Sequence, residues 1–288
     1  MNNDEDAMKA APAQGVVASS PLGRAVTYRD TYDPGLLFPV ARQPKRDELG
    51  LTAASLPFAG VDVWNAYEIS WLNPRGKPVV ALGQFKVPAD SPRLIESKSL
   101  KLYLNSYNQT TFATFDAVRT RIAADLSAAS GAAVEVDLVP VQDASARRFA
   151  HPSGVLLDEL DIDCTVYQPD PALLRAGGEV VTEELLYSHL LKSNCLVTGQ
   201  PDWGMLAVRY AGPQIDRAAL LRYIVSFRGH DEFHEQCVER VFCDIQARCR
   251  PQRLAVWARY TRRGGLDINP FRTCGGFEMP ENVFEARQ

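Results

Sequence analysis

Residues 193–204 (SNCLVTGQPDWG) contain the two side chains best suited to covalent chemistry, Cys195 and Asp202. A thiolate is a strong nucleophile, and a carboxyl group within hydrogen-bond reach can exchange a proton with the thiol and with a substrate. Pro201 and Gly204 favour a loop at the end of a strand, where reactive groups are common. Taken alone, an intracellular cysteine is more often a small buried hydrophobic residue than a nucleophile. The segment therefore makes Cys195 a candidate nucleophile and Asp202 its candidate acid.

The other cysteines and the histidines do not indicate a metal site. The chain has six cysteines, Cys164, Cys195, Cys237, Cys243, Cys249 and Cys274, and none belongs to a CxxC pair. It has four histidines, His151, His189, His230 and His234, and none has a convincing ligand spacing with a cysteine. Because the sequence shows no export signal, we expect reduced thiols and no metal. No GxGxxG follows a predicted strand, so a dinucleotide would be held without a Rossmann fold.

The composition is that of an ordinary soluble globular protein. Of the 288 residues, 46% are hydrophobic and 23% charged, which is enough to build a core without disulfides or metals. The 31 basic and 35 acidic side chains give a net charge of −4, which argues against a nucleic-acid partner. No stretch reaches the roughly 18 apolar residues of a membrane span. We expect a cytoplasmic protein that binds neither membranes nor nucleic acid directly.

The first half is predicted to contain a hairpin, a helix and a third strand. Residues 62–72 and 78–87 are expected to be strands on either side of the turn Asn73-Pro74-Arg75-Gly76. A helix is expected over 113–129, where Phe115, Val118, Ile122 and Leu126 share one face and Gly131 ends it. Residues 133–139 should return as a strand. We expect a disordered or extended segment over 1–35 and a first domain over 36–150.

The second half, residues 151–288, is predicted to repeat this order. It opens with alternating apolar residues from Leu160 to Val166, followed by extended segments at about 180–192 and 205–211. Two helices should follow, capped by Asp216 and Asp231, and the closing strand should be 253–261. Both halves thus run from strands through helices to a strand. The pattern indicates the α+β class with antiparallel sheets and a possible duplication.

Four motifs resemble the 7-cyano-7-deazaguanine reductases, a family of nitrile reductases. Residues 193–204 resemble the active-site segment of that family, and ESKSLKLY at 96–103 resembles the motif that separates it from its folding relatives. Phe-His-Glu at 233–235 and RRGGLDINP at 262–270 match as well. The resemblance covers residues from about 35 to 285, in the long form of the family with two modules.

The resemblance implies a particular fold and assembly. The family adopts the tunnelling fold, in which each module has an antiparallel sheet backed by two helices and the modules join into a barrel around a channel. Active sites lie at the interfaces between modules. Because open sheet edges are closed by neighbouring modules, a homodimer of this two-module chain is expected.

The resemblance also implies the reaction. A nitrile is reduced by four electrons to a primary amine at the expense of two NADPH. The small-molecule substrate is a 7-deazaguanine base that is later inserted into tRNA as queuosine. Cys195 would add to the nitrile to form a thioimidate, which a nicotinamide can reduce more readily than a nitrile. Asp202 would protonate the nitrile nitrogen and help deprotonate the thiol, with His234 close to the reacting nitrogen.

Binding residues follow from the same motifs. Carboxylates suit the N–H and exocyclic amine of a purine-like base, so Glu235 and Glu96 would read the substrate. The full set of substrate-binding positions is Ile95, Glu96, Ser97, His234 and Glu235. The cofactor-binding positions are Ser97, Lys98, Arg263 and Gly264, and a lysine or arginine beside the 2′-phosphate would favour NADPH over NADH. Considered alone, Glu96 would be interpreted as a surface charge and His234 as a helix-face hydrogen bond.

Two other functions compete with this one. A cyclohydrolase on the same fold would hydrolyse its substrate, typically with zinc held by cysteine and histidine. A non-enzymatic module could bind a guanine-like base through Glu96 and Glu235 with an unreactive Cys195. Thiol reactivity separates the second alternative from a reductase, because a binding module has no reason to keep a highly reactive Cys195.

Overall fold

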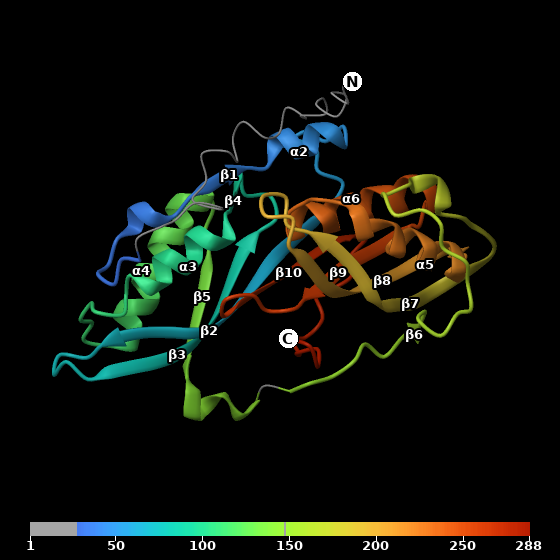
Figure 1. Cartoon of the computed structure of the whole chain (residues 1–288). Helices are drawn as coiled ribbons and strands as arrows, with labels where there is room; N and C mark the ends of the chain where they lie inside the picture. Colours follow the sequence, from blue (N-terminus) through green and yellow to red (C-terminus); the bar gives the residue numbers. More distant parts are fainter. Residues whose placement is uncertain (1–27, 147) are drawn as a thin grey trace, which may run out of the picture.

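The computed structural model describes residues 28–146 and 148–288, and an eight-stranded twisted sheet runs through both halves of the chain (Figure 1). The strand order is β5-β3-β2-β10-β9-β8-β7-β6, and all neighbours are antiparallel except β6 and β7. The strands are β2 (Ala59–Leu72), β3 (Pro78–Pro88), β5 (Glu135–Pro140), β6 (Val155–Leu156), β7 (Ala176–Asn194), β8 (Pro201–Ile215), β9 (Arg253–Tyr260) and β10 (Leu266–Cys274).

Helices cover one face of this sheet, and a short strand pair lies beside it (Figure 1). The α-helices are α2 (Gln43–Glu48), α3 (Ser97–Asn105), α4 (Phe115–Ser130), α5 (Arg217–Ser226) and α6 (His234–Cys249). The 3₁₀ helices are η1 (Pro34–Leu36), η2 (Val141–Ala146), η3 (Pro171–Leu173) and η4 (Phe227–Gly229). The strand pair is β1 (Pro39–Ala41) with β4 (Arg93–Ile95). None of the described helices is both long and apolar enough to cross a bilayer.

The predicted elements of the first half are confirmed. β2 and β3 form the expected hairpin, and Asn73 Oδ1 accepts hydrogen bonds from the backbone N–H groups of Arg75 and Lys77 in its turn. α4 buries Val118, Ile122 and Leu126, and it ends at Gly131, which has a φ of +80° that a glycine adopts without strain.

The sequence analysis missed the helix α3. Leu100, Tyr103, Leu104 and Tyr107 are spaced as one face of a helix, and all four are buried in the core that α4 shares with β2 and β3. The helix begins after Glu96, whose carboxylate accepts hydrogen bonds from the first turn. Glutamate is an uncommon N-cap, so the usual start signal was absent.

Both helices of the second half were predicted. The predicted N-cap of α5 is confirmed, and the predicted N-cap of α6 is wrong. Asp216 caps α5, because its Oδ1 accepts a hydrogen bond from Ala219 N at 3.0 Å. Asp231 does not cap α6; the N-cap is Phe233, which provides no side-chain hydrogen bond. Asp231 instead accepts a hydrogen bond from Asn194 Nδ2 at 2.9 Å, which connects the end of β7 to the segment before α6.

The strand at 253–261 was predicted to be the last, and this was wrong, because β10 follows it. Gly264 and Gly265 both have positive φ, +58° and +80°, and Arg263 N donates to Leu266 O at 2.8 Å. Two consecutive residues with positive φ form the tight turn that suits the twist of a hairpin. Residues 262–270 therefore turn the chain into a further strand.

β10 connects the two halves into one sheet. It pairs with β9 on one side and with β2 on the other, from Leu266 opposite Ala66 to Thr273 opposite Ala59. The antiparallel sheets expected for the two halves are therefore parts of one continuous sheet. Among the described residues the sheet stays open, and its end strands are β5 and β6.

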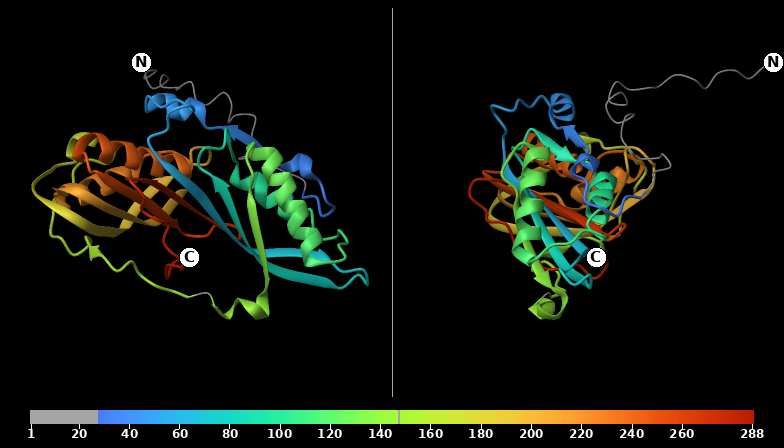
Figure 2. Two further views of the ribbon diagram at one scale, coloured as in Figure 1. Left: turned by 180° about the vertical axis from the view of Figure 1, so that it is seen from behind. Right: turned by 90° about the vertical axis from the view of Figure 1, so that its left-hand side faces the viewer.

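The chain crosses the molecule between the two halves. Residues 141–146 lie at the β5 end of the sheet, and residues 148–175 lead to the opposite end (Figure 2). The domain boundary expected near residue 150 falls in this segment.

Part of the predicted N-terminal tail is packed. Residues 1–27 lie outside the described residues, but Tyr32 packs edge to face on Tyr107 with 5.4 Å between ring centroids, and its hydroxyl donates to Asp125 at 2.8 Å. Residues 28–35 are therefore attached to the first half.

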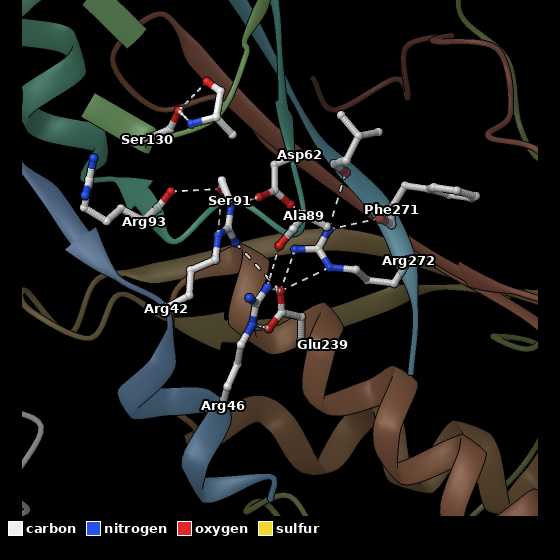
Figure 3. Close-up of polar contacts among 12 residues, drawn as sticks. Arg42, Arg46, Asp62, Ala89, Ser91, Arg93, Ser130, Glu239, Phe271 and Arg272 are labelled. Carbon is white, nitrogen blue, oxygen red and sulfur yellow. Dashed lines mark hydrogen bonds and ion pairs between the residues drawn. The ribbon is translucent and has the colours of Figure 1, made fainter. Parts of the chain in front are cut away.

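Five buried charged side chains join the two halves beside α2 (Figure 3). Arg42 Nη2 lies 2.5 Å from Asp62 Oδ2, and Arg272 Nη1 lies 2.7 Å from Asp62 Oδ1. Arg46 Nη2 and Arg272 Nη2 donate to Glu239 Oε1 at 2.7 and 2.9 Å. Burial alone would raise the pKa of Asp62 and of Glu239, but the guanidinium groups hold both below their usual values. We call these five residues the arginine cluster.

Glu239→Gln should lower the free energy of unfolding by about 3 to 5 kcal/mol, because it leaves buried guanidinium groups without a charge partner. The measurement is urea unfolding at pH 7. The matched control is Glu135→Gln, which breaks an exposed pair with Lys86 and should change stability by about 1 kcal/mol or less. Equal effects of the two substitutions would show that the arginine cluster does not stabilise the fold.

Candidate active site

A narrow pocket lies where the first and second halves meet, and most of the predicted site residues line it. From the first half come Ile95 and Ser97. From the second half come Cys195, Asp202, His234, Glu235 and Arg263. Glu96, Lys98 and Gly264 are not among the residues that form its wall.

Cys195 lies in the loop that joins β7 to β8, and this loop positions its thiol in the pocket wall. Within this loop, Cys195 N donates to Gln200 O at 2.8 Å and Gly199 N donates to Cys195 O at 2.9 Å. Just before it, Asn194 N donates to His230 O at 2.8 Å and Glu232 N donates to Asn194 O at 3.1 Å. These bonds fix the thiol-bearing loop to the segment that starts α6.

Asp202 lies near the start of β8, and its carboxylate lies between the guanidinium of Arg263 and the imidazole of His234. Its Oδ1 is 2.5 Å from Arg263 Nη1, and its Oδ2 is 3.3 Å from His234 Nε2. Burial would raise the pKa of Asp202, but His234 and Arg263 together lower it. At neutral pH Asp202 is therefore a carboxylate that can accept a proton.

His234 is held flat against Tyr260. Their ring centroids are 3.8 Å apart and the ring planes differ by 10°. The Nδ1 atom of His234 is buried and has no hydrogen-bond partner among the described residues. The stacking fixes the imidazole so that its Nε2 points at Asp202.

Glu235 is the residue after His234 in the first turn of α6. It is almost completely buried in the pocket wall, with 2% of its surface exposed. Burial and the nearby carboxylate of Asp62 raise its pKa to about 7, while Arg42 and His234 act in the opposite direction. Glu235 therefore changes its charge close to neutral pH.

Glu96, predicted to read the base, is fully buried at the start of α3. Its two carboxylate oxygens accept hydrogen bonds from Lys98 N at 2.7 Å and Ser99 N at 2.8 Å. Burial raises its pKa, and these two bonds oppose that effect. The residues on either side of it, Ile95 and Ser97, form part of the pocket wall.

The sequence analysis missed Lys101, a cation in the pocket wall. Burial and the nearby Arg263 lower its pKa. Its side chain packs beside the Arg263–Leu266 turn, where a Cβ on Gly264 would lie 3.2 Å from Lys101 Cδ. The signal was its place three residues after Lys98 in the same helix, which puts both lysines on one face.

Glu232 holds the segment just before α6. Its carboxylate accepts hydrogen bonds from Arg240 Nη2 at 2.8 Å and Arg240 Nε at 3.1 Å, and it lies 2.8 Å from His230 Nε2. Although burial would raise its pKa, these partners lower it to about 2. Glu232 is also part of the pocket wall. The contacts that hold the segment before α6 therefore also hold part of the pocket.

Comparison with known proteins gives consistent matches along the chain. A family model described as "Nitrile reductase, 7-cyano-7-deazaguanine-reductase N-term" matches residues 28–138, and one described as "QueF-like protein" matches residues 201–276. A protein of Azoarcus sp. named "NADPH-dependent 7-cyano-7-deazaguanine reductase" is 69% identical over 96% of this chain and 98% of its own length. Proteins of the same name from Aromatoleum aromaticum and Dechloromonas aromatica are 63% and 62% identical, over 94% of this chain and 96% and 95% of theirs.

Glu232→Gln should destabilise the protein at neutral pH and progressively less in acid. The folded pKa of about 2 lies below the ordinary value of 4.5, so the stabilisation is complete above about pH 4.5 and is lost as pH falls toward 2. Its full size should be on the order of 2 to 3 kcal/mol. Urea unfolding of both proteins from pH 7 to pH 3 measures the difference. A gap that stays constant over this range would contradict the assignment.

Proposed function

The chain belongs to the family of NADPH-dependent 7-cyano-7-deazaguanine reductases, and from that premise we propose that Cys195 forms a covalent thioimidate with the substrate nitrile. The observation that carries the proposal is the pocket that holds Cys195 together with Asp202, His234 and Glu235. Membership of this family makes the chain an NADPH-dependent oxidoreductase, and it disfavours both the zinc-dependent hydrolase and the non-enzymatic base-binding module.

Asp202 acts first as a base in this proposal. Its lowered pKa keeps it ionised at neutral pH, so it can take the proton from the Cys195 thiol. The thiolate then adds to the nitrile carbon, and the developing negative charge on nitrogen takes the same proton back from Asp202. The step breaks S–H, forms C–S and N–H, and changes no oxidation state. Arg263 and His234 stabilise the Asp202 carboxylate before the first transfer and after the second.

Reduction of the thioimidate requires hydride. NADPH supplies it twice, and with two protons this converts the nitrile to a primary amine and releases the sulfur. We propose that Ser97, Lys98, Arg263 and Gly264 hold the cofactor. The basic side chains Lys101 and Arg263 on one wall of the pocket fit the phosphates of such a ligand.

Glu235 is the proposed reader of the base. When ionised it offers two acceptor oxygens, which match the N–H and exocyclic amine on one edge of 7-cyano-7-deazaguanine. Ile95, Ser97 and His234 surround the same pocket and would contact the ring. We propose a supporting role for Glu96, which fixes the start of α3 and so the position of both Ile95 and Ser97.

We further propose the tunnelling fold, a homodimer and a place in queuosine synthesis, with 7-aminomethyl-7-deazaguanine as product. Each half has two long strands, then two helices and then a returning strand, and in the second half β10 follows as a further strand. The outer side of β7 is paired only at Leu186 and Tyr187 among the described residues, which leaves an edge for a second copy.

The covalent step can be tested without the cofactor. Wild-type protein mixed with 7-cyano-7-deazaguanine alone should gain one substrate mass per chain, because addition to the nitrile needs no hydride. Cys195→Ala should form no adduct, whereas Cys243→Ala, a matched control at another partly buried cysteine, should still form it. Asp202→Asn should slow adduct formation by a factor on the order of 10². Intact-protein mass spectrometry follows all four reactions, and an adduct on Cys195→Ala would overturn the mechanism.

Replacement of the two basic residues should separate cofactor binding from chemistry. Lys98→Met should raise KM for NADPH by about tenfold and leave KM for NADH nearly unchanged, because only NADPH loses a phosphate partner. Arg263→Met should also slow adduct formation, because Asp202 loses its ion-pair partner. Steady-state kinetics with both cofactors, together with the mass-spectrometric assay, measure this. Equal weakening of both cofactors by Lys98→Met would place Lys98 away from the 2′-phosphate.

A further inference from the structure

The pocket and the arginine cluster share one helix. Glu235 and Glu239 are one turn apart on α6, so both lie on the same face of that helix. Figure 3 shows Glu239 at the centre of the cluster, with Arg46 reaching it from α2 and Arg272 from β10. The wall of the pocket is thus continuous with a group of buried charges that belongs mainly to the first half of the chain.

Within this cluster, the Nη1 nitrogen of Arg42 donates no hydrogen bond to any described residue. Its Nη2 pairs with Asp62 at 2.5 Å, and its Nε donates to Ser91 Oγ at 3.2 Å. Its Nη1 lies 3.8 Å from Glu239 Oε1, and this buried nitrogen has no hydrogen-bond partner among the described residues. A buried guanidinium with an unused donor favours a further negative charge nearby.

The charges of the cluster do not balance without Glu235. Arg42, Arg46 and Arg272 carry three positive charges, and Asp62 and Glu239 carry two negative charges. An uncompensated charge in the interior is costly. The carboxylate of Glu235, which senses Asp62 and Arg42 most strongly among the charged groups around it, would complete the balance.

We propose that Arg42 and Asp62 are positioning residues for Glu235, through which the first half of the chain controls the charge of the side chain that reads the base. The inference rests on the proposed role of Glu235 in substrate binding and extends it to two residues outside the pocket wall. The two act in opposite directions: the guanidinium stabilises the Glu235 carboxylate, and the Asp62 carboxylate destabilises it.

Other charged groups also lie near Glu235, and they are the same in Arg42→Met, Arg42→Lys and Asp62→Asn. On α6 these are His234 and, one turn further on, Glu239, which pairs with Arg272 of β10. Arg46 approaches from α2. Across the pocket lie Lys101, Asp202, Glu232 and Arg263.

The sign of each effect follows from the requirement that Glu235 be ionised to accept hydrogen bonds from the base. The pKa of Glu235 is about 7, so the carboxylate is partly protonated under ordinary conditions. Arg42→Met removes a stabilising positive charge and should move the pH midpoint of substrate binding to higher pH. Asp62→Asn removes a destabilising negative charge and should move it to lower pH.

The experiment measures the Kd of 7-cyano-7-deazaguanine by calorimetry from pH 6 to 9, with Cys195→Ala as the parent so that no adduct forms. Arg42→Met should weaken binding roughly threefold at pH 7.5, as expected for a rise of about one pH unit in that midpoint, and should approach the parent at pH 9. Asp62→Asn should bind more tightly than the parent at pH 6. Titration of the substrate itself is common to all proteins and cancels in the comparison.

Two controls separate charge from structure. Arg42→Lys keeps the positive charge and should restore a midpoint close to that of the parent. Arg46→Met removes a different arginine of the same cluster, one that pairs with Glu239, and should move the midpoint less than Arg42→Met does. A purely structural role for Arg42 would instead raise Kd equally at every pH.

The outcomes distinguish the inference from the function on which it rests. If Glu235→Gln binds the substrate as tightly as the parent, the proposed role of Glu235 is wrong. If Glu235→Gln weakens binding but the midpoints of Arg42→Met and Asp62→Asn coincide or move in the same direction, only the inference is overturned. Should Arg42→Met not fold, Asp62→Asn decides alone: a midpoint at lower pH supports the inference, and an unchanged one overturns it.

Discussion

β10 pairs with β2 over eight residue pairs, and the positions of the site residues depend on this pairing. β2 belongs to the first half of the chain and β10 to the second, so their hydrogen bonds make one sheet from two. The pairing also places Ile95 and Ser97 opposite the loop that carries Cys195. Neither half holds all the side chains of the pocket. The chemistry proposed for this chain is therefore a property of the junction.

The arginine cluster gives this junction an electrostatic component. Backbone hydrogen bonds fix the register of β2 against β10, but they do not depend on which side chains the two strands carry. Asp62 on β2 and Arg272 on β10 add a specific contact between the same two strands. Because buried charges tolerate few alternative arrangements, the cluster favours one relative placement of the two halves. It does so directly behind α6, whose first turn carries His234 and Glu235.

The sequence was sufficient for much of this structure because local patterns and short motifs dominate it. The β2–β3 hairpin, the Gly131 stop and the Asp216 cap follow from turn and capping chemistry that acts within a few residues. What it could not provide depends on distant partners. The position of β10 requires β2, some 200 residues away. Arg42 is likewise recognisable only once the two halves are in contact, where its Nη1 approaches Glu239. Glu96 is a local exception: the family resemblance assigned it to the base, and glutamate is too uncommon an N-cap to indicate that its carboxylate caps α3.

The position of β10 also affects how the chain can be synthesised. It leaves the ribosome some 200 residues after β2, yet it lies between β2 and β9 inside the sheet. Until residues 266–274 emerge, β2 presents one unpaired edge to its surroundings, and such edges recruit other strands. A nascent chain of this protein therefore carries an aggregation-prone edge until β10 has been made. Chaperones that shield this edge, or slow translation of the final segment, would act on the yield of the protein without touching its active site.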